Sequence, residues 1–318
     1  AILHLIVYLG FIIINIELIE IIIDGLFGTH RIFAFMGSFY DFLIASFEIL
    51  AFLVLVACVI FLIRRNIIKI KRFWSPEMQG WPTNDANFIL IFEILLMSAF
   101  LLMNTADVIL QEKYTEYYAQ VGSYPISSFL VPLFSDYSIS TLIIIERVCW
   151  WVHIIGILIF LNYLVISKHL HILLAFPNTY FANLNPKGQF NNMESVTREV
   201  KMMLNPDIDP FSQPNNDANT DRFGVKDATD LTRLQLLNSY SCTECGRCTA
   251  ECPANLTGKK LSPRKIMMDV RDRIDQIGHN IDQYGTQFND NKTLLRDFIS
   301  PEEIWACTSC NACVEACP

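Results

Sequence analysis

Long apolar stretches separated by short polar ones fill the first half of the chain. Residues 1–24, 40–63, 87–110 and about 140–166 are each almost wholly hydrophobic. An α-helix needs about 20 such residues to cross the hydrocarbon core of a bilayer, which is about 30 Å thick. The pattern therefore predicts an all-α fold whose first part is a transmembrane bundle with four visible helices.

The second half of the chain is polar and carries weaker helix signals. Residues 205–221 are rich in Pro, Asn and Asp, as in a connector. The helix signals beyond it are the spaced leucines Leu231, Leu234 and Leu237, a start at Ser262 and Pro263 of a helix through about Ile277, and the capping-box residues Ser300, Pro301 and Glu303. We therefore expect a membrane domain over 1–174, a linker over 175–224 and an α-helical domain over 225–318 that continues beyond 318.

Basic residues predict how the bundle is oriented. The polar loop after the second apolar stretch contains Arg64, Arg65, Lys69, Lys71 and Arg72, whereas the loop after the third contains Lys113 beside several acids. Loops rich in Lys and Arg stay on the cytoplasmic side. The pattern predicts a multi-pass protein of the inner (cytoplasmic) membrane, with everything after about residue 175 in the cytoplasm.

Composition excludes one class of partner. Hydrophobic residues make up 52% of the chain, and its formal net charge is −8. Proteins that bind nucleic acid present a basic face to the phosphates. We therefore expect no nucleic-acid partner.

Eight of the ten cysteines form two copies of one motif, C-x2-C-x2-C-x3-C-P, offset by 65 residues. This run binds [4Fe-4S] clusters, with three thiolates on one cluster and the fourth on the other. It predicts two clusters, the first held by Cys242, Cys245, Cys248 and Cys317, and the second by Cys307, Cys310, Cys313 and Cys252.

Disulfides and zinc are the alternative roles of these cysteines. Disulfides need an oxidising compartment and loops longer than these tight runs. Structural zinc usually takes paired C-x2-C units further apart, and it remains the main alternative. The other two cysteines, Cys58 and Cys149, lie in apolar stretches and are expected to be small core residues.

Histidines in the membrane segment suggest haem. His153 and His171 are 18 residues apart, which is five turns of a continuous helix and about 27 Å along its axis. Both would then project from one face, whereas His169 would point away. Neutral imidazole is a common axial ligand of haem iron, although a membrane histidine can equally hydrogen-bond to a neighbouring helix.

Each haem needs a second ligand. His4 lies at the depth expected for His171, so these two form the predicted inner pair. His30 follows the first apolar stretch on the outer side, and His153 lies close to Trp150 and Trp151, which mark the outer interface. His30 and His153 form the predicted outer pair, which requires the loop that carries His30 to fold back towards the bilayer.

The chain resembles a known combination of domains. The part with His153 and His171 resembles the haem-b domain of the gamma subunit of respiratory nitrate reductase, and the cysteine part resembles the di-cluster domain of heterodisulfide reductases. The combination is similar to membrane-bound heterodisulfide-reductase-like (Fe-S) oxidoreductases that exchange electrons with quinones. The resemblance implies two b-type haems, a quinone substrate, and a cysteine-rich CCG domain as a partner subunit or a missing C-terminal domain. In the gamma subunit the other two haem ligands share one helix, whereas His4 and His30 here are 26 residues apart.

Acids in the apolar stretches are candidates for handling quinone protons, because a carboxylate in a bilayer is costly. Glu48 is the first candidate since it lies deepest in its stretch, and Glu93 is the second. Glu17, Glu20, Asp24 and Asp107 are further acids of this kind. Hydrogen bonding between helices would explain many of them equally well.

These features together predict an electron-transfer protein, the membrane part of a quinone-linked oxidoreductase complex. Electrons would pass between a cytoplasmic partner, for example an electron-transfer flavoprotein, and the quinone pool through two clusters and haem b. One alternative is a non-catalytic anchor for a CCG-domain subunit, and another is a cluster-bearing redox sensor with a purely structural bundle.

Overall fold

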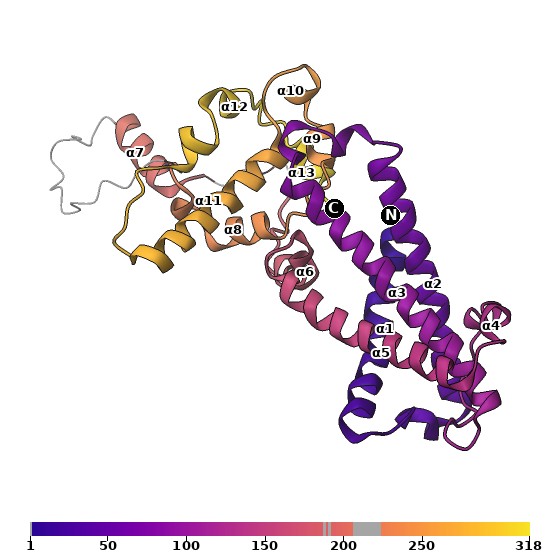
Figure 1. Ribbon diagram of the computed structural model, residues 1–318. Helices are drawn as coiled ribbons and strands as arrows, with labels where there is room; N and C mark the ends of the chain where they lie inside the picture. Colours follow the sequence, from indigo (N-terminus) through magenta and orange to yellow (C-terminus); the bar gives the residue numbers. More distant parts are fainter. Residues whose placement is uncertain (1, 187–188, 190–191, 206–223) are drawn as a thin grey trace. The chain divides into compact units, whose positions relative to one another are not determined.

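A computed structural model of the protein describes residues 2–186, 189, 192–205 and 224–318 (Figure 1). These residues form helices joined by turns, and no strand occurs among them. The chain divides into two compact units, Ala1–Ser167 and Lys168–Pro318. The predicted all-α fold is confirmed.

The first unit contains four helices that are long and apolar enough to cross a membrane. They are α1 (Ile2–Phe27), α2 (Ser38–Asn66), α3 (Trp81–Lys113) and α5 (Ile139–Leu164). Each overlaps one predicted stretch, but α3 begins well before residue 87. Its first turns are polar, so a hydropathy pattern does not detect them. Gly80, with a φ of 81°, turns the backbone just before the helix, and Trp81 and Pro82 then begin it.

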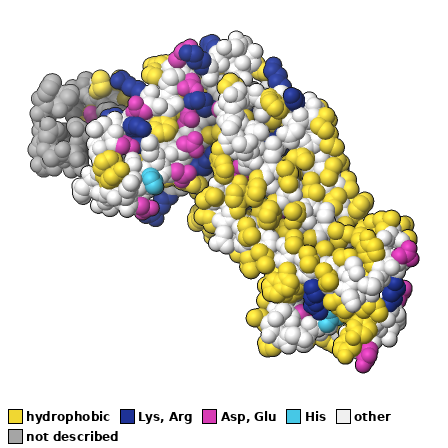
Figure 2. Space-filling model, in the orientation of Figure 1, with side chains coloured by type: hydrophobic (Ala, Val, Ile, Leu, Met, Phe, Trp, Pro, Cys, Tyr) yellow, Lys and Arg dark blue, Asp and Glu magenta, His cyan; other side chains and the backbone are white. Residues whose placement is uncertain are grey.

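The helices pack in chain order, α1 on α2, α2 on α3 and α3 on α5. Their shared core includes Ile44, Ala51, Val54 and Phe100. Their outward faces are apolar as well, as Figure 2 shows for the side of the bundle in view. A surface of this kind suits lipid, because an exposed apolar belt would be unstable in water.

Glycine allows the closest approach of α3 and α5. A Cβ at Gly156 of α5 would come within 2.6 Å of Leu96 Cδ2 on α3. Small residues at helix contacts let backbones come together in membranes. The contact brings α5 against α3 one turn from His153.

Helix α5 ends at Leu164, which corrects the expectation of one helix through His171. The chain tightens after Leu164, since Ile166 N–H donates to the Tyr163 carbonyl and Ser167 N–H to the Leu164 carbonyl. The Ser167 hydroxyl then donates to Asp85 on α3. A 3₁₀ turn at Lys168–Leu170 and a new helix, α6 (His171–Tyr180), follow. The argument that 18 residues place His153 and His171 on one helical face is therefore wrong.

Two connections close one end of the bundle. A 3₁₀ turn at Ile32–Met36 joins α1 to α2, and a longer segment with a 3₁₀ turn at Ser127–Phe129 and the short helix α4 (Val131–Phe134) joins α3 to α5. Ser127 is fully buried and its hydroxyl donates to the Leu101 carbonyl. This second connection therefore packs into the bundle rather than lying over it.

The second unit is built from short helices around one long helix. They are α6 (His171–Tyr180), α7 (Glu194–Leu204), α8 (Arg233–Tyr240), α9 (Arg247–Ala250), α10 (Pro253–Leu256), α11 (Pro263–Tyr284), α12 (Pro301–Trp305) and α13 (Ala312–Ala316). The predicted capping box is present at α12, and α11 continues beyond Ile277 to Tyr284. Helices α6 and α7 lie partly or wholly in the predicted linker, and most of the predicted connector at 205–221 lies outside the described residues.

Arg273 holds the core of the second unit together. Its guanidinium donates to both carboxylate oxygens of Asp227, to Asp290 and to the Lys292 carbonyl, at 2.7 to 3.2 Å. Arg273 lies on α11 and is 3% exposed. One buried side chain thus ties α11 to two separate segments.

Candidate functional sites

The two cysteine loops have the same backbone conformation. Glu244 and Gly246 in the first motif have φ of 56° and 72°, and Ser309 and Asn311, 65 residues later, have φ of 53° and 59°. Three of these four residues are not glycine, and positive φ is uncommon for them. Each loop is followed by a short helix, α9 or α13, and these two helices pack together. The sequence repeat is therefore also a structural repeat.

This conformation turns main-chain N–H groups towards sulfur. The Ser309 N–H donates to Cys307 Sγ over 3.4 Å. Backbone N–H groups that converge in such turns favour negative charge. The Ala312 N–H and the Thr308 side chain lower the pKa of the Cys310 thiol. A loop of this kind suits thiolates that hold iron.

Thiols of the two loops are close enough to affect one another's pKa, although no group of three or more His, Cys, Asp or Glu side chains among the described residues is placed to hold a metal ion. Burial is the main cause that raises the pKa of the Cys248 thiol, and the nearby thiols of Cys245 and Cys317 raise it further. In the second set, burial raises the pKa of Cys313, and Cys252 and Cys307 add to the rise. Cys317 and Cys252 thus each influence a thiol of the other motif, and the crossed ligand sets stay a prediction.

The first cysteine loop is fixed by ion pairs. Glu244 is buried, and its carboxylate pairs with Arg271 of α11 at 2.8 Å and with Lys168. Burial raises the pKa of the neighbouring Cys242 thiol to about 11. Iron would therefore have to displace a tightly held proton from this cysteine, which a positively charged cluster core does when it binds thiolate.

His153 has the geometry of a ligand held in place. It is buried on α5, and its Nδ1 lies 3.1 Å from the Leu96 carbonyl oxygen. A histidine that binds metal usually donates its other ring nitrogen to a carbonyl or carboxylate. With Nδ1 as the donor, Nε2 is the nitrogen that can bind iron.

The two predicted inner ligands, His4 and His171, are in different parts of the chain. Nδ1 of His171 lies 3.0 Å from the Lys168 carbonyl oxygen, and its ring is edge-on to His169. These residues belong to the second unit, whereas His4 is in the first turns of α1 in the first unit. The pairing of His4 with His171 stays a prediction.

His30 has a partner other than His153. Its Nε2 lies 3.4 Å from Asp107 Oδ1, and its ring is edge-on to Tyr118. This contact engages the nitrogen that a haem iron would need. His30 therefore does not fit the predicted outer haem pair as well as it fits a polar site of its own.

A buried polar cluster surrounds Arg31 at this end of the bundle. Its guanidinium donates to Asp107 at 2.9 and 3.3 Å, to Glu17 at 3.1 Å and to Asn104 at 2.9 Å. A buried guanidinium with two carboxylate partners keeps its charge, because deprotonation would leave both acids unpaired. Arg31 therefore holds α1 to α3.

The acids of α1 pin the loop that follows it. Asp24 accepts hydrogen bonds from the Arg31 N–H at 2.7 Å and from the Ile32 N–H. Glu20 accepts from the Phe33 N–H at 2.9 Å and from the Tyr40 hydroxyl at 2.8 Å. The sequence left open whether these acids serve as hydrogen-bond acceptors between elements. The contacts of Glu20 and Asp24 fit that role.

Glu48 is also fully engaged. It is 0% exposed, and its carboxylate accepts from Asn104 at 3.1 Å, from the N–H groups of Ile126 and Ser127 at 2.9 and 3.1 Å, and from the Ser127 hydroxyl. These bonds hold the buried connection between α3 and α5. Glu93 is half-buried on α3 close to Cys58 of α2. Their predicted proton roles stay predictions, but the geometry of Glu48 is that of a structural residue.

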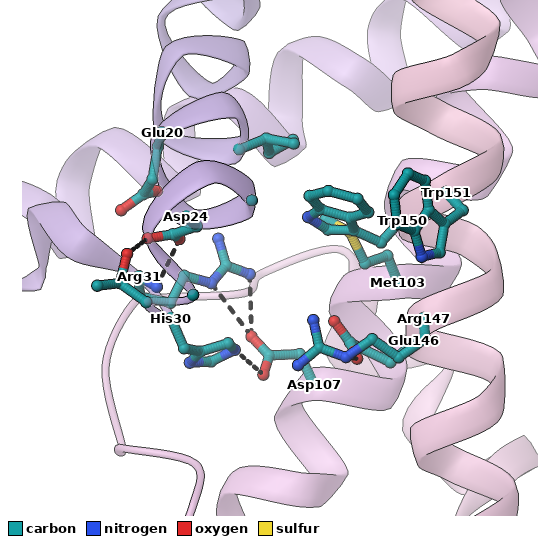
Figure 3. A pocket seen from close by; sticks show the side chains of 14 residues that line it. Glu20, Asp24, His30, Arg31, Met103, Asp107, Glu146, Arg147, Trp150 and Trp151 are labelled. Atoms are coloured by element: carbon teal, nitrogen blue, oxygen red, sulfur yellow. Dashed lines mark hydrogen bonds and ion pairs between the residues drawn. The ribbon is translucent and has the colours of Figure 1, made fainter.

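A pocket of about 240 Å³ opens beside the Arg31 cluster (Figure 3). Its polar wall contains Glu20, Asp24, His30, Arg31, Asp107, Glu146 and Arg147, and its apolar wall contains Ile21, Met103, Trp150 and Trp151. Figure 3 shows His30 and Arg31 reaching Asp107 from one side, with Glu146 and Arg147 on the other. Glu146 is buried and lies 3.1 Å from Arg147 Nε.

The sequence patterns did not point to Arg31, Asn104, Glu146 or Arg147. The candidate proton-handling residues were acids within the apolar stretches. Arg31 lies in a loop, and Glu146 lies in the stretch of about 140–166 but has a basic neighbour that suggests a surface pair. A usable signal was present, since an arginine between apolar stretches that contain acids needs a counter-ion.

Comparison with known proteins identifies the cysteine part. Residues 241–318 match the family model described as a 4Fe-4S dicluster domain. The predicted [4Fe-4S] binding by this part of the chain is confirmed at that level. No solved structure matches the chain.

Several curated relatives are redox proteins. The chain is 29% identical to the probable iron-sulfur-binding oxidoreductase FadF of Bacillus subtilis strain 168, over 100% of this chain and 44% of that protein. It is 25% identical to the EtfAB:quinone oxidoreductase of Syntrophomonas wolfei, over 89% of this chain and 39% of that protein. It is 34% identical to a probable membrane-anchored ferredoxin of Chromohalobacter salexigens, over 30% of this chain and 16% of that protein.

The chain spans less than half the length of the first two relatives. An iron-sulfur polypeptide of the CoB–CoM heterodisulfide reductase of Methanopyrus kandleri is also similar, at 31% identity over 26% of this chain. The similarity supports an iron-sulfur oxidoreductase with an electron-transfer function, as the predicted resemblance to heterodisulfide-reductase-like proteins implied.

Proposed function

We propose that this chain carries electrons between a soluble redox partner and the quinone pool of the membrane, through two [4Fe-4S] clusters. The observation that carries the proposal is the presence, in one chain, of a 4Fe-4S dicluster domain with two repeated cysteine loops and of four helices long and apolar enough to cross a membrane. Clusters supply one-electron steps, and the protein sets their spacing and surroundings. The similarity to an EtfAB:quinone oxidoreductase supports quinone as the membrane substrate.

The proposed orientation places the cluster unit in the cytoplasm. The loop between α2 and α3 contains five basic residues from Arg64 to Arg72, and α5 leaves the bundle at the same end as this loop, since successive helices run in opposite directions. The pocket near Arg31 lies at the opposite end, where α1 ends and α5 begins. It would face the outer side.

The proposal includes haem b at two separate sites, an outer one and an inner one. His153 is the best-supported ligand because its Nδ1 is held by the Leu96 carbonyl. His171 and His4 are the proposed ligands of an inner haem. A bound haem would supply a one-electron carrier inside the bundle. The contact of His30 with Asp107 leaves the second ligand of His153 open.

The soluble partner is proposed from chemistry and similarity. One relative is named EtfAB:quinone oxidoreductase, and an electron-transfer flavoprotein is the first proposed partner. By resemblance to heterodisulfide reductases, the second is a CCG-domain subunit or a further domain of this protein. Either would exchange electrons with the clusters of the second unit.

The test uses anaerobically purified protein in detergent. We expect about eight cluster iron atoms per chain in addition to any haem iron, a spectrum of reduced [4Fe-4S] clusters after dithionite, and reoxidation of these clusters by a soluble naphthoquinone. Zinc in place of iron would contradict the cluster assignment. Clusters that reduce normally but never respond to quinone would instead favour the anchor function.

A further inference from the structure

The pocket beside Arg31 has the features of a binding site for a small ring whose oxygen atoms accept hydrogen bonds in one redox state and donate them in the other. Its volume, about 240 Å³, is below the roughly 300 Å³ at which sites for drug-sized ligands begin. It combines a polar wall with the rings of Trp150 and Trp151. A single aromatic headgroup would fill it while an attached chain stayed in lipid.

The polar wall contains two acid–base pairs, and one of them uses the Asp107 oxygen that does not bond to Arg31. His30 Nε2 faces Asp107 Oδ1 at 3.4 Å, and Arg147 Nε faces Glu146 Oε2 at 3.1 Å. Neither carboxylate oxygen has a hydrogen-bond partner of good geometry, although Asp107 and Glu146 are 1% and 3% exposed. A buried polar atom without a hydrogen-bond partner costs free energy unless a bound ligand supplies that partner.

The apolar wall provides access from the bilayer. Trp151 is 56% exposed on the outward face of α5, at the depth where tryptophan rings lie in membrane proteins. Trp150 packs over Gly25 of α1, where a Cβ would come within 3.0 Å of the indole ring. The glycine therefore lets the Trp150 ring of α5 pack against α1 at the wall of the pocket.

We propose that this pocket binds the quinone headgroup, with His30 and Glu146 as the two groups that exchange protons with its carbonyl oxygens. The inference rests on the proposed quinone-linked function and assigns its site. In quinone reduction two electrons arrive from the iron-sulfur clusters. His30 and Glu146 each give one proton to a carbonyl oxygen, and both C=O groups become C–OH. Asp107 and Arg147 position these two donors, and the protons are replaced from the outer aqueous side past Asp24.

Two oxygens need two donors in the oxidised ligand and two acceptors in the reduced one. A histidine and a carboxyl group can each do both, whereas Arg31 can only donate and is already bonded to Glu17, Asn104 and Asp107. Quinol oxidation would use the same residues in reverse.

The experiment uses the full chain in detergent with reduced clusters and a soluble naphthoquinone as the oxidant. We expect Glu146→Gln to slow quinone-dependent reoxidation by about 10²-fold and Glu146→Asp to recover part of the rate. Reoxidation by ferricyanide, which reacts with exposed clusters, should not change. Glu112→Gln, an exposed acid near the end of α3, is the matched control and should keep the wild-type rate.

His30→Gln is the second variant if Glu146→Gln does not fold, and iron content checks the folding of each. A wild-type rate in both variants would overturn the pocket assignment, and so would slow ferricyanide reoxidation, which would place the defect at the clusters. If the wild-type protein itself does not respond to naphthoquinone, the quinone-linked function fails before the pocket is tested.

Discussion

The ring of His153 on α5 is held by the main-chain carbonyl of Leu96 on α3, with 3.1 Å between Nδ1 and the oxygen. The next turn of α5 carries Gly156, whose missing side chain lets Leu96 approach. The hydrogen bond and the close helix contact fix the ring together. A residue in this position is prepared to bind a ligand through Nε2.

We predict that His153→Ala removes a b-type haem absorption band from the purified protein while its iron-sulfur clusters remain. The reason is that the imidazole would be the axial ligand and the clusters lie in another unit. Optical spectra of the dithionite-reduced protein give the measurement. His169→Ala is the control, and equal loss of the band from both variants would show that haem loss does not report the ligand.

The predicted crossed ligand sets assign each cysteine to one of the two clusters, and single substitutions test that assignment. Cys317→Ser should damage the cluster of the first motif, because Cys317 lies near Cys248. Cys252→Ser should damage the cluster of the second motif, because Cys252 lies near Cys313. Electron paramagnetic resonance of the two variants should show different losses from the two-cluster spectrum.

Cys149→Ser provides the control, since Cys149 lies on α5 in the membrane unit. If Cys317→Ser and Cys313→Ser leave the same remaining signal, the ligands are not crossed and each motif holds its own cluster.

Arg273 predicts both the stability of the cluster unit and its response to acid. Arg273→Met should lower the free energy of unfolding by about 3–5 kcal/mol, because it removes the buried guanidinium that pairs with the carboxylates of Asp227 and Asp290. The urea midpoint, followed by loss of iron-sulfur absorbance, gives the measurement. Arg271→Met is not a suitable control because Arg271 pairs with Glu244, so the control is Arg233→Met at the exposed start of α8.

The acid response follows from the same contacts. Burial raises the pKa of Asp227, but hydrogen bonds from Arg273 and two backbone N–H groups outweigh it and hold the pKa below its usual value. The hydrogen bond from Arg273 also lowers the pKa of Asp290. Folding is therefore favoured above the unfolded pKa, and this contribution is lost as pH falls through the folded values. The gap in urea midpoint between wild type and Arg273→Met should narrow as pH falls below about 4, and a constant gap would contradict the assignment.

Glu48 and Glu93 can be separated by two amide substitutions. Glu48→Gln should destabilise the bundle, because the amide NH₂ would face the N–H groups of Ile126 or Ser127. Glu93→Gln should leave thermal stability near that of the wild type, since Glu93 is half-buried. Thermal inactivation in detergent measures both. A loss of quinone reactivity in Glu93→Gln alone would move the quinone site to the middle of α3.

The membrane helices and the cysteine loops could be predicted because each follows from a local pattern. Hydropathy needs only about 20 residues to report a spanning helix, and the cysteine spacing by itself indicates a 4Fe-4S dicluster domain. The break after Leu164 could not be predicted, because the apolar sequence continues through Ile166 and the helix ends through bonds to Asp85, a residue far away in the chain.

Which residues pair within the polar cluster could not be predicted for a similar reason. Glu17, Asn104 and Asp107 come from helices whose faces meet only in the folded bundle, and Arg31 joins them from a loop. Single residues marked the acids as unusual, but their partners depend on the packing of α1 against α3. Pairing between distant elements was the information that the sequence lacked.

The pocket beside Arg31 and the end of α5 lie at opposite ends of the bundle, and this separation has an electrical consequence. In the proposed orientation, an electron that travels from the clusters to the pocket moves outward through the low-dielectric core. An inside-negative membrane potential assists that movement by up to about 2.3 kcal/mol per electron for every 100 mV. An inside-negative membrane voltage would therefore let a donor reduce the quinone even if the donor has the higher reduction potential. The reaction would consume part of that voltage.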